Sequence, residues 1–173
     1  MAIKFLELSI LLVLALISDI KSCKIKNTLT VPFMIVAIVI NSVHSGMSGL
    51  IDSLLGISIP VILLFILFGL RMLSAGDIKL FCAIGSIMGM NFVLETICFS
   101  FLAGGLIGLA VMTIRGNIRE RTKFLHNYLK TCLITFSISE YVHESGQEKS
   151  GLFRFAYAIA AGSLVALNFH FLL

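Results

Sequence analysis

Apolar runs long enough to cross a lipid bilayer recur along almost the whole chain, and this feature limits the fold more than any other. The hydrocarbon core of a bilayer is about 30 Å thick, so a spanning helix needs about 20 mostly apolar residues. Of the 173 residues, 58% are hydrophobic and only 13% are charged, whereas a soluble domain carries about 25% charged residues. The sequence therefore predicts an all-α integral membrane protein.

Six segments are apolar and long enough to be membrane spans. They lie near residues 3–19, 29–45, 50–71, 75–91, 92–114 and 152–172. The first segment is expected to stay as a membrane helix, because no small-x-small cleavage site of a signal peptide follows it. Pro60 should kink the third span, and Asn91 is expected at the tight turn between the fourth and fifth. No linker divides the chain, so we predict a single polytopic domain over residues 1–173.

The basic residues predict the orientation of these spans. With this assignment, all of the 13 lysines and arginines except Lys4 fall on one side of the membrane. The side rich in Lys and Arg is cytoplasmic in membrane proteins, so both chain termini are predicted to be external. The net charge of +4 is then a signal of topology and of contact with anionic membrane lipid, and no nucleic acid is expected as a partner.

Two aspartates stand where apolar spans meet basic loops. Asp19 ends the first span and Asp77 begins the fourth, so both lie at the predicted cytoplasmic face. Helical rise from Asp77 to Asn91 is about 21 Å, which places Asp77 below the cytoplasmic surface if Asn91 reaches the outer interface. A carboxylate at membrane depth is costly and is a functional-site hypothesis by default.

Two carboxylates that share a site suggest acid/base chemistry. They cannot both ionise easily, so one keeps a proton while the other can act as a base. The ionised partner can draw a proton from an attacking water, and the protonated partner can supply the leaving amine. Gly76, beside Asp77, has no side chain and would let a substrate backbone approach closely.

Metal chemistry has little support in the sequence. The four cysteines form no C-x-x-C pair, and the four histidines form no pair at i and i+4. These are the spacings expected of zinc sites. We therefore predict neither a metal nor a cofactor.

Two segments of the chain resemble motifs of the type IV prepilin peptidases, a family of GxGD-class intramembrane aspartic proteases. The stretch from Asp19 to Pro32 is similar to the segment in which an Asp ends the first helix and a basic, Ile-Pro-Asn-like stretch follows. Ser74-Ala75-Gly76-Asp77-Ile78-Lys79-Leu80 resembles G-x-G-D-x-K-L. The resemblance implies that Asp19 and Asp77 are catalytic, with Gly76, Lys79 and Asn27 supporting the motifs. Ser74 departs from the pattern by replacing its first Gly, and Lys26 stands where a Pro is common.

The chain looks like the short, tight-adherence or Flp-type branch of this family. The cysteine-rich zinc region and the large cytoplasmic loop of bifunctional members are expected to be missing, so N-methylation of the pilin is not expected. The resemblance implies cleavage of prepilin leader peptides at the cytoplasmic face of the bacterial cytoplasmic membrane, with prepilins or pilin-like proteins as partners. The alternatives are a small proton- or cation-coupled transporter that uses the carboxylates as a relay, and a non-catalytic assembly scaffold.

The connection between the fifth and sixth spans has a helical pattern of its own. Apolar residues recur at i, i+3 and i+4 over 120–136, with basic and polar residues between them. This pattern is typical of an amphipathic helix in the cytoplasmic interface, which could be a lipid anchor or a lid over the catalytic mouth. Asp52 and Glu95 lie near the predicted outer side and are expected to take no part in catalysis.

Overall fold

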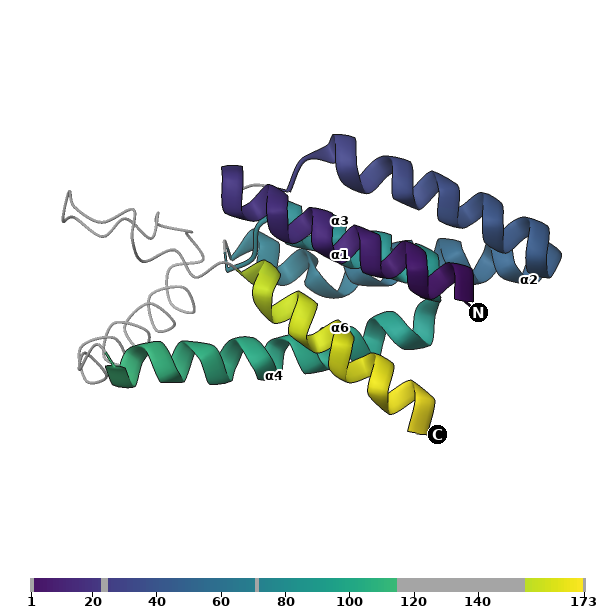
Figure 1. Cartoon of the computed structure of the whole chain (residues 1–173). Helices are drawn as coiled ribbons and strands as arrows, with labels where there is room; N and C mark the ends of the chain where they lie inside the picture. The colour runs from purple at the N-terminus through teal and green to yellow at the C-terminus, as the bar shows by residue number, and fades with distance from the viewer. Residues whose placement is uncertain (1, 23–24, 71, 115–154, 173) are drawn as a thin grey trace. The chain divides into compact units, whose positions relative to one another are not determined.

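The computed structural model describes residues 2–22, 25–70, 72–114 and 155–172 (Figure 1). These residues form helices and, within these ranges, no strand, which confirms the predicted all-α class. The helices are α1 (Ala2–Ser22), α2 (Asn27–Gly69), α3 (Ala75–Met88), α4 (Met90–Ile114) and α6 (Phe155–Leu172). The amphipathic helix predicted over 120–136 lies outside the described residues.

The chain divides into two compact units, which are residues 1–104 with 154–173, and residues 105–153. The first unit contains α1, α2, α3, the beginning of α4, and α6. Of the second unit, only residues 105–114, at the end of α4, are described. The single polytopic domain predicted over 1–173 stays a prediction.

Helix α2 is a hairpin of two helical legs. Its backbone is non-helical at Gly46, with φ 62° and ψ −139°, a conformation that glycine adopts without steric cost. Asn41 and Ser53 lie on opposite sides of this break and are hydrogen bonded at 2.8 Å, whereas a straight helix would separate them by about 18 Å. The two legs, which double back in Figure 1, match the spans predicted at 29–45 and 50–71. The break at Gly46 falls in the connection predicted between these two spans, and the kink predicted at Pro60 within the third span stays a prediction.

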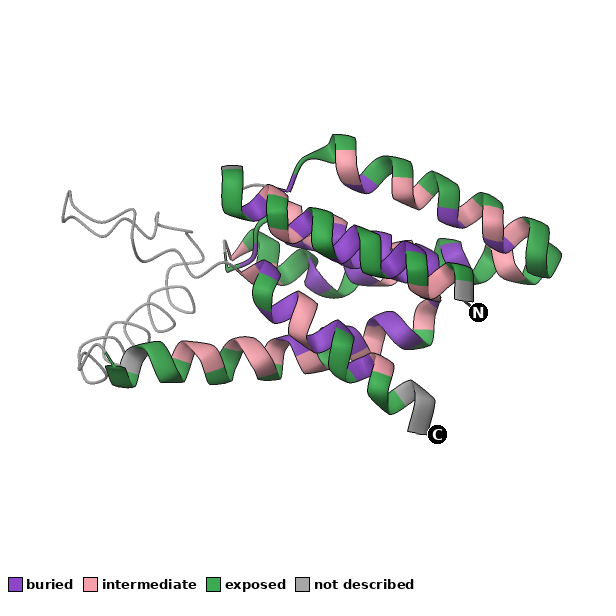
Figure 2. Cartoon of the chain, in the orientation of Figure 1, coloured by how far each residue is buried: buried purple, intermediate pink, exposed green. Residues whose placement is uncertain are grey.

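Two of the described helices have the length and apolar composition of membrane segments. Helix α2 and residues Met90–Val111 of α4 are long and apolar enough to cross a membrane, and Phe155–Phe169 of α6 is a shorter apolar stretch. Large apolar residues are exposed along α1, α2 and α6, and Figure 2 shows how exposed and buried residues alternate along these helices. Soluble monomers rarely expose apolar surface of this extent, and contact of this surface with membrane lipid stays a prediction. The count of six spans stays a prediction.

Helix α3 lies at the centre of the first unit. It packs against α1, α2 and α6, and every residue from Leu80 to Ile87 is buried. Close packing with α2 depends on two glycines, because a Cβ added at Gly56 would collide with the carbonyl group of Gly85, and the reverse also holds. The apolar run of α3 therefore fills a protein core on all sides.

The turn between α3 and α4 is at Gly89, where φ is 94°. The sequence predicted this turn at Asn91, which instead lies in the first turn of α4. The Asp52 carboxylate of α2 approaches Gly89 closely and accepts a 3.2 Å hydrogen bond from the Met90 backbone N–H. A side chain at position 89 would collide with that carboxylate, so Gly89 meets both the conformational and the steric demands of the turn.

Candidate active site

Asp19 and Asp77 come from the ends of two packed helices. Asp19 lies in the last turn of α1, and Asp77 lies in the first turn of α3. Each residue is only 8% exposed. Helices α1 and α3 are in contact, so the two acids are held by neighbouring elements of the core although they are far apart in the sequence.

The two carboxylates are close enough for their charges to act on each other. The charge of Asp19 disfavours a second negative charge on Asp77. Burial of both side chains in a low-dielectric environment strengthens this repulsion. The structure thus brings together the two acids that the sequence predicted as a pair, and a proton held by one of the two carboxyl groups stays a prediction.

Ser74 holds the Asp77 side chain at the start of α3. The Ser74 hydroxyl donates to Asp77 Oδ2 at 2.8 Å, and the Ser74 backbone N–H donates to the same oxygen at 3.2 Å. In return, Ser74 Oγ accepts from the Asp77 backbone N–H at 3.2 Å. This reciprocal arrangement is a capping box, which satisfies backbone donors at a helix N-terminus. It fixes the side-chain torsions of Asp77.

Ser74 is a site residue that the sequence reasoning treated only as a departure from G-x-G-D. The signal was available, because a Ser three residues before an acid at the start of an apolar run is the pattern of a capping box. The glycine that the family motif has at this position could not make the two side-chain hydrogen bonds. Ser74 is therefore a positioning residue for Asp77 in this chain.

Gly76 lies against the connection between α1 and α2. A Cβ at Gly76 would stand 3.3 Å from Ile25 Cβ and 3.4 Å from Ser74 Oγ. Ile25 is itself buried. The missing side chain thus lets the start of α3 approach the segment that follows Asp19, and the close approach of a substrate backbone at Gly76 stays a prediction.

Lys79 and Asn27 also meet. Lys79 Nζ donates a 2.7 Å hydrogen bond to Asn27 Oδ1, which joins α3 to the first residue of α2. Both residues were expected only to support the motifs, and no pairing between them was predicted. The bond crosses from the Asp77 segment to the segment that follows Asp19, so it holds the two halves of the site in register.

The other acids lie elsewhere. Asp52 caps the N-terminus of α4 at the opposite end of α3, and Glu95 lies on α4. Neither is grouped with Asp19 and Asp77. Among the described residues, no three His, Cys, Asp or Glu side chains are clustered in a way that could hold a metal ion; Cys23 and Cys132 lie outside that part of the chain. The metal-free site stays a prediction.

Comparison with known proteins gives the family. Residues 6–109 match the type IV leader peptidase family, and this region contains both Asp19 and Asp77. The chain belongs to that family. It is 30% identical over 114 residues to a prepilin leader peptidase/N-methyltransferase of Bacillus subtilis (strain 168). The aligned region covers 64% of this chain and 45% of the relative, so the chain spans less than half of that protein's length. No solved structure matches the chain.

Proposed function

We propose that this protein is a membrane aspartic endopeptidase that cleaves the leader peptide of type IV prepilins of the Flp or Tad kind at the cytoplasmic membrane face. The observation that carries the proposal is the juxtaposition of two buried carboxylates, Asp19 and Asp77, whose charges act on each other. Membership of the leader peptidase family supports it. So does the name of the relative, which is a prepilin leader peptidase.

The proposed chemistry needs only the two carboxyl groups and a water. The ionised carboxylate takes a proton from the water as its oxygen attacks the scissile carbonyl carbon. The protonated partner donates a hydrogen bond to the carbonyl oxygen and then a proton to the leaving amine. Within the described residues, the hydrogen bonds to the Asp77 side chain all reach Oδ2, which orients the other oxygen, Oδ1, for the substrate or the water.

The membrane placement is part of the proposal. Asp19 lies in the last turn of α1 and Asp77 in the first turn of α3, and large apolar residues are exposed on α1 and on α2 and α6. We place these two helix ends at the cytoplasmic face, with six spans and both termini external. Reporter fusions test this: fusions after residues 24, 76 and 140 should read cytoplasmic, and those after 47 and 173 external. A cytoplasmic C-terminus would contradict the even number of spans.

Substitution of the two acids tests the chemistry. Asp19→Asn and Asp77→Asn should each lower cleavage of a co-expressed Flp-type prepilin by at least about 100-fold, because asparagine keeps the shape but cannot exchange a proton. The matched control is Asp52→Asn, which changes an acid at the other end of α3 and should leave cleavage near the wild-type level. The shift of prepilin size on a gel measures the result.

The outcome separates the proposal from its rivals. Cleavage by either variant at a near wild-type rate would exclude the carboxylate pair as the catalytic group. If neither variant changes cleavage but both abolish proton or cation flux into proteoliposomes, the relay function of a transporter takes its place. Protein levels in the membrane fraction should be equal for all variants, which shows that loss of activity is chemical.

A further inference from the structure

The two carboxyl groups of the proposed catalytic pair are equally buried but differently held. Asp19 and Asp77 are each 8% exposed, so transfer out of water disfavours the charged form of both to a similar degree. The repulsion between them also acts on both, since each charge is felt by the other. Which acid keeps the proton therefore depends on hydrogen bonds and on the place of each acid in its helix.

Asp77 has two hydrogen-bond donors on one of its carboxylate oxygens. The Ser74 backbone N–H, 3.2 Å from Asp77 Oδ2, can only donate, so Oδ2 is an acceptor. The Ser74 hydroxyl lies 2.8 Å from the same oxygen, and its own oxygen already accepts from the Asp77 backbone N–H, so its proton is directed to Oδ2. Hydrogen bonds donated to a carboxylate favour its ionised form.

The helix ends add to this difference. Asp77 is residue N3 of α3, where the helix dipole favours a negative charge. Asp19 lies in the last turn of α1, where the dipole has the opposite sign and disfavours a carboxylate. Lys21 is in the same turn but is exposed, and a residue two positions on does not face Asp19 along the helix. The helix ends thus place the charge on Asp77 and the proton on Asp19.

We infer that Asp77 is the ionised base of the pair, that Asp19 is its protonated acid, and that Ser74 sets this division of roles. The inference rests on the proposed peptidase function, in which the two carboxyl groups hold one proton. Asp77 Oδ1, the oxygen to which Ser74 is not hydrogen bonded, then faces the attacking water. Ser74 is a positioning residue that acts through Asp77.

The proton steps balance with this assignment. Asp77 Oδ1 takes one proton from water as the water oxygen bonds to the scissile carbonyl carbon, and protonated Asp19 donates a hydrogen bond to the oxyanion that forms. When the C–N bond breaks, the carbonyl re-forms and the Asp19 proton passes to the leaving nitrogen. The pair then holds its one proton on Asp77, and transfer of that proton to Asp19 restores the starting state.

Carboxyl-carbon NMR tests the inference without a substrate. The sequence has three aspartates, Asp19, Asp52 and Asp77, so the full chain labelled with ¹³C at the aspartate carboxyl gives three signals in detergent, which Asp52→Asn and Asp77→Asn assign. The chemical shift, and its change between H₂O and D₂O, separates a protonated from an ionised carboxyl group. Asp52 is exposed and is the internal reference. At neutral pH the proton should lie on Asp19 at least about tenfold more often than on Asp77.

Variants of Ser74 test its part in the division. Ser74→Ala removes the hydroxyl donor and should lower the ratio of protonated Asp19 to protonated Asp77 by about tenfold. Ser74→Thr keeps the hydroxyl and should keep the ratio. Ser58→Ala is the matched control, because the Ser58 hydroxyl bonds only within its own helix, and it should leave the three signals unchanged. A lower melting temperature of Ser74→Ala with the wild-type ratio would limit Ser74 to a structural role.

Three results in the wild type would overturn the inference: a proton mainly on Asp77, an equal division between the two acids, and the same charge state on both. Loss of prepilin cleavage in Asp19→Asn and Asp77→Asn, together with any of these, would keep the peptidase function and reject only the division of roles. A proton found on Asp19 in a wild-type chain that cleaves no prepilin would instead reject the peptidase function. The two failures are therefore distinguishable.

Discussion

Lys79 of α3 donates a 2.7 Å hydrogen bond to Asn27, the first residue of α2. Lys79 follows Asp77 by two positions, and Asn27 belongs to the segment that leads away from Asp19. The bond therefore joins the two stretches that carry the acids. Neither partner is one of the proposed catalytic groups, so we expect the bond to affect catalysis only through the relative position of the two acids.

Breaking this bond should weaken catalysis more than stability. Both side chains are on the surface, so Lys79→Met or Asn27→Ala should cost only about 1 kcal/mol of folding free energy. Prepilin cleavage should fall several-fold in each variant, and by little more in the double variant, because both changes remove the same contact. Lys21→Met is the control, since Lys21 is an exposed lysine that follows Asp19 with the same spacing. Fully additive losses in the double variant would show that the two residues act separately.

Loss of the Ser74 side chain should loosen Asp77. Ser74→Ala removes the N-cap of α3 and should cost about 1 kcal/mol of stability, whereas Ser74→Gly should cost only a few tenths. Both variants remove the hydroxyl that donates to Asp77 Oδ2, so both should lower the cleavage rate by up to about tenfold. Thermal unfolding in detergent and prepilin cleavage measure the two effects.

Ser58→Ala is the control for Ser74, because Ser58 is exposed and its hydroxyl bonds only to its own helix. Full activity of Ser74→Thr, which keeps the hydroxyl, would agree with the capping role. Wild-type activity of Ser74→Gly, which lacks the hydroxyl, would contradict the role of Ser74 in positioning Asp77.

The contact between Gly56 and Gly85 should tolerate no added side chain. A Cβ at either position would meet backbone of the other helix, so Gly56→Ala or Gly85→Ala must push α2 and α3 apart. Overpacking of this kind costs about 1–3 kcal/mol. Gly69→Ala is the matched control, because a Cβ there has nothing within 4 Å. The melting temperature of the purified protein measures the difference, and equal values for Gly56→Ala and Gly69→Ala would contradict the close approach.

Asn41 should be important for the fold of the α2 hairpin. Its Nδ2 donates to Ser53 Oγ at 2.8 Å and to the Ser86 carbonyl at 2.9 Å, so it ties both legs of α2 to α3. Asn41→Ala removes the buried amide that donates to Ser53 Oγ, although the Ser86 carbonyl still accepts from Ser53 Oγ at 3.0 Å, and it should destabilise the protein by about 1–3 kcal/mol. Asn168→Ala is the control, since Asn168 is exposed and bonds within its own helix. Chemical unfolding curves of the two variants compare these effects, and similar midpoints would show that the network contributes little.

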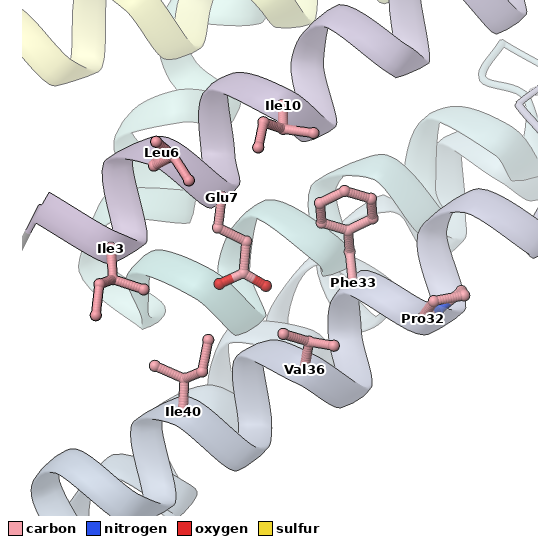
Figure 3. Close-up of a pocket in the computed structure, with 8 residues that line it drawn as sticks. All are labelled: Ile3, Leu6, Glu7, Ile10, Pro32, Phe33, Val36 and Ile40. Atoms are coloured by element: carbon pink, nitrogen blue, oxygen red, sulfur yellow. The ribbon is translucent and has the colours of Figure 1, made fainter.

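Glu7 shows where sequence reasoning stopped short. It stands within an apolar run without any motif around it, and the sequence analysis did not single it out. An acid inside a predicted span is itself a signal of function, and that signal was present. Glu7 is buried in the structure and lines a groove between α1 and the first leg of α2 (Figure 3). The side of α1 on which it lies follows from contact with that leg and cannot be read from α1 alone.

The sequence by itself determined the helices and the place of the acids on them. Length and hydropathy are local properties, so the predicted spans agree with α1, the two legs of α2, α3, α4 and α6 to within a few residues. Asp19 and Asp77 at helix ends, and the family, also follow from local patterns. Tertiary structure alone decided that Lys79 meets Asn27, that Gly56 meets Gly85, and that the α3–α4 turn is at Gly89. These features depend on which surfaces of separate helices pack together. The packing is determined by the fit of side-chain shapes and by the pairing of buried polar groups between residues that are far apart in the sequence.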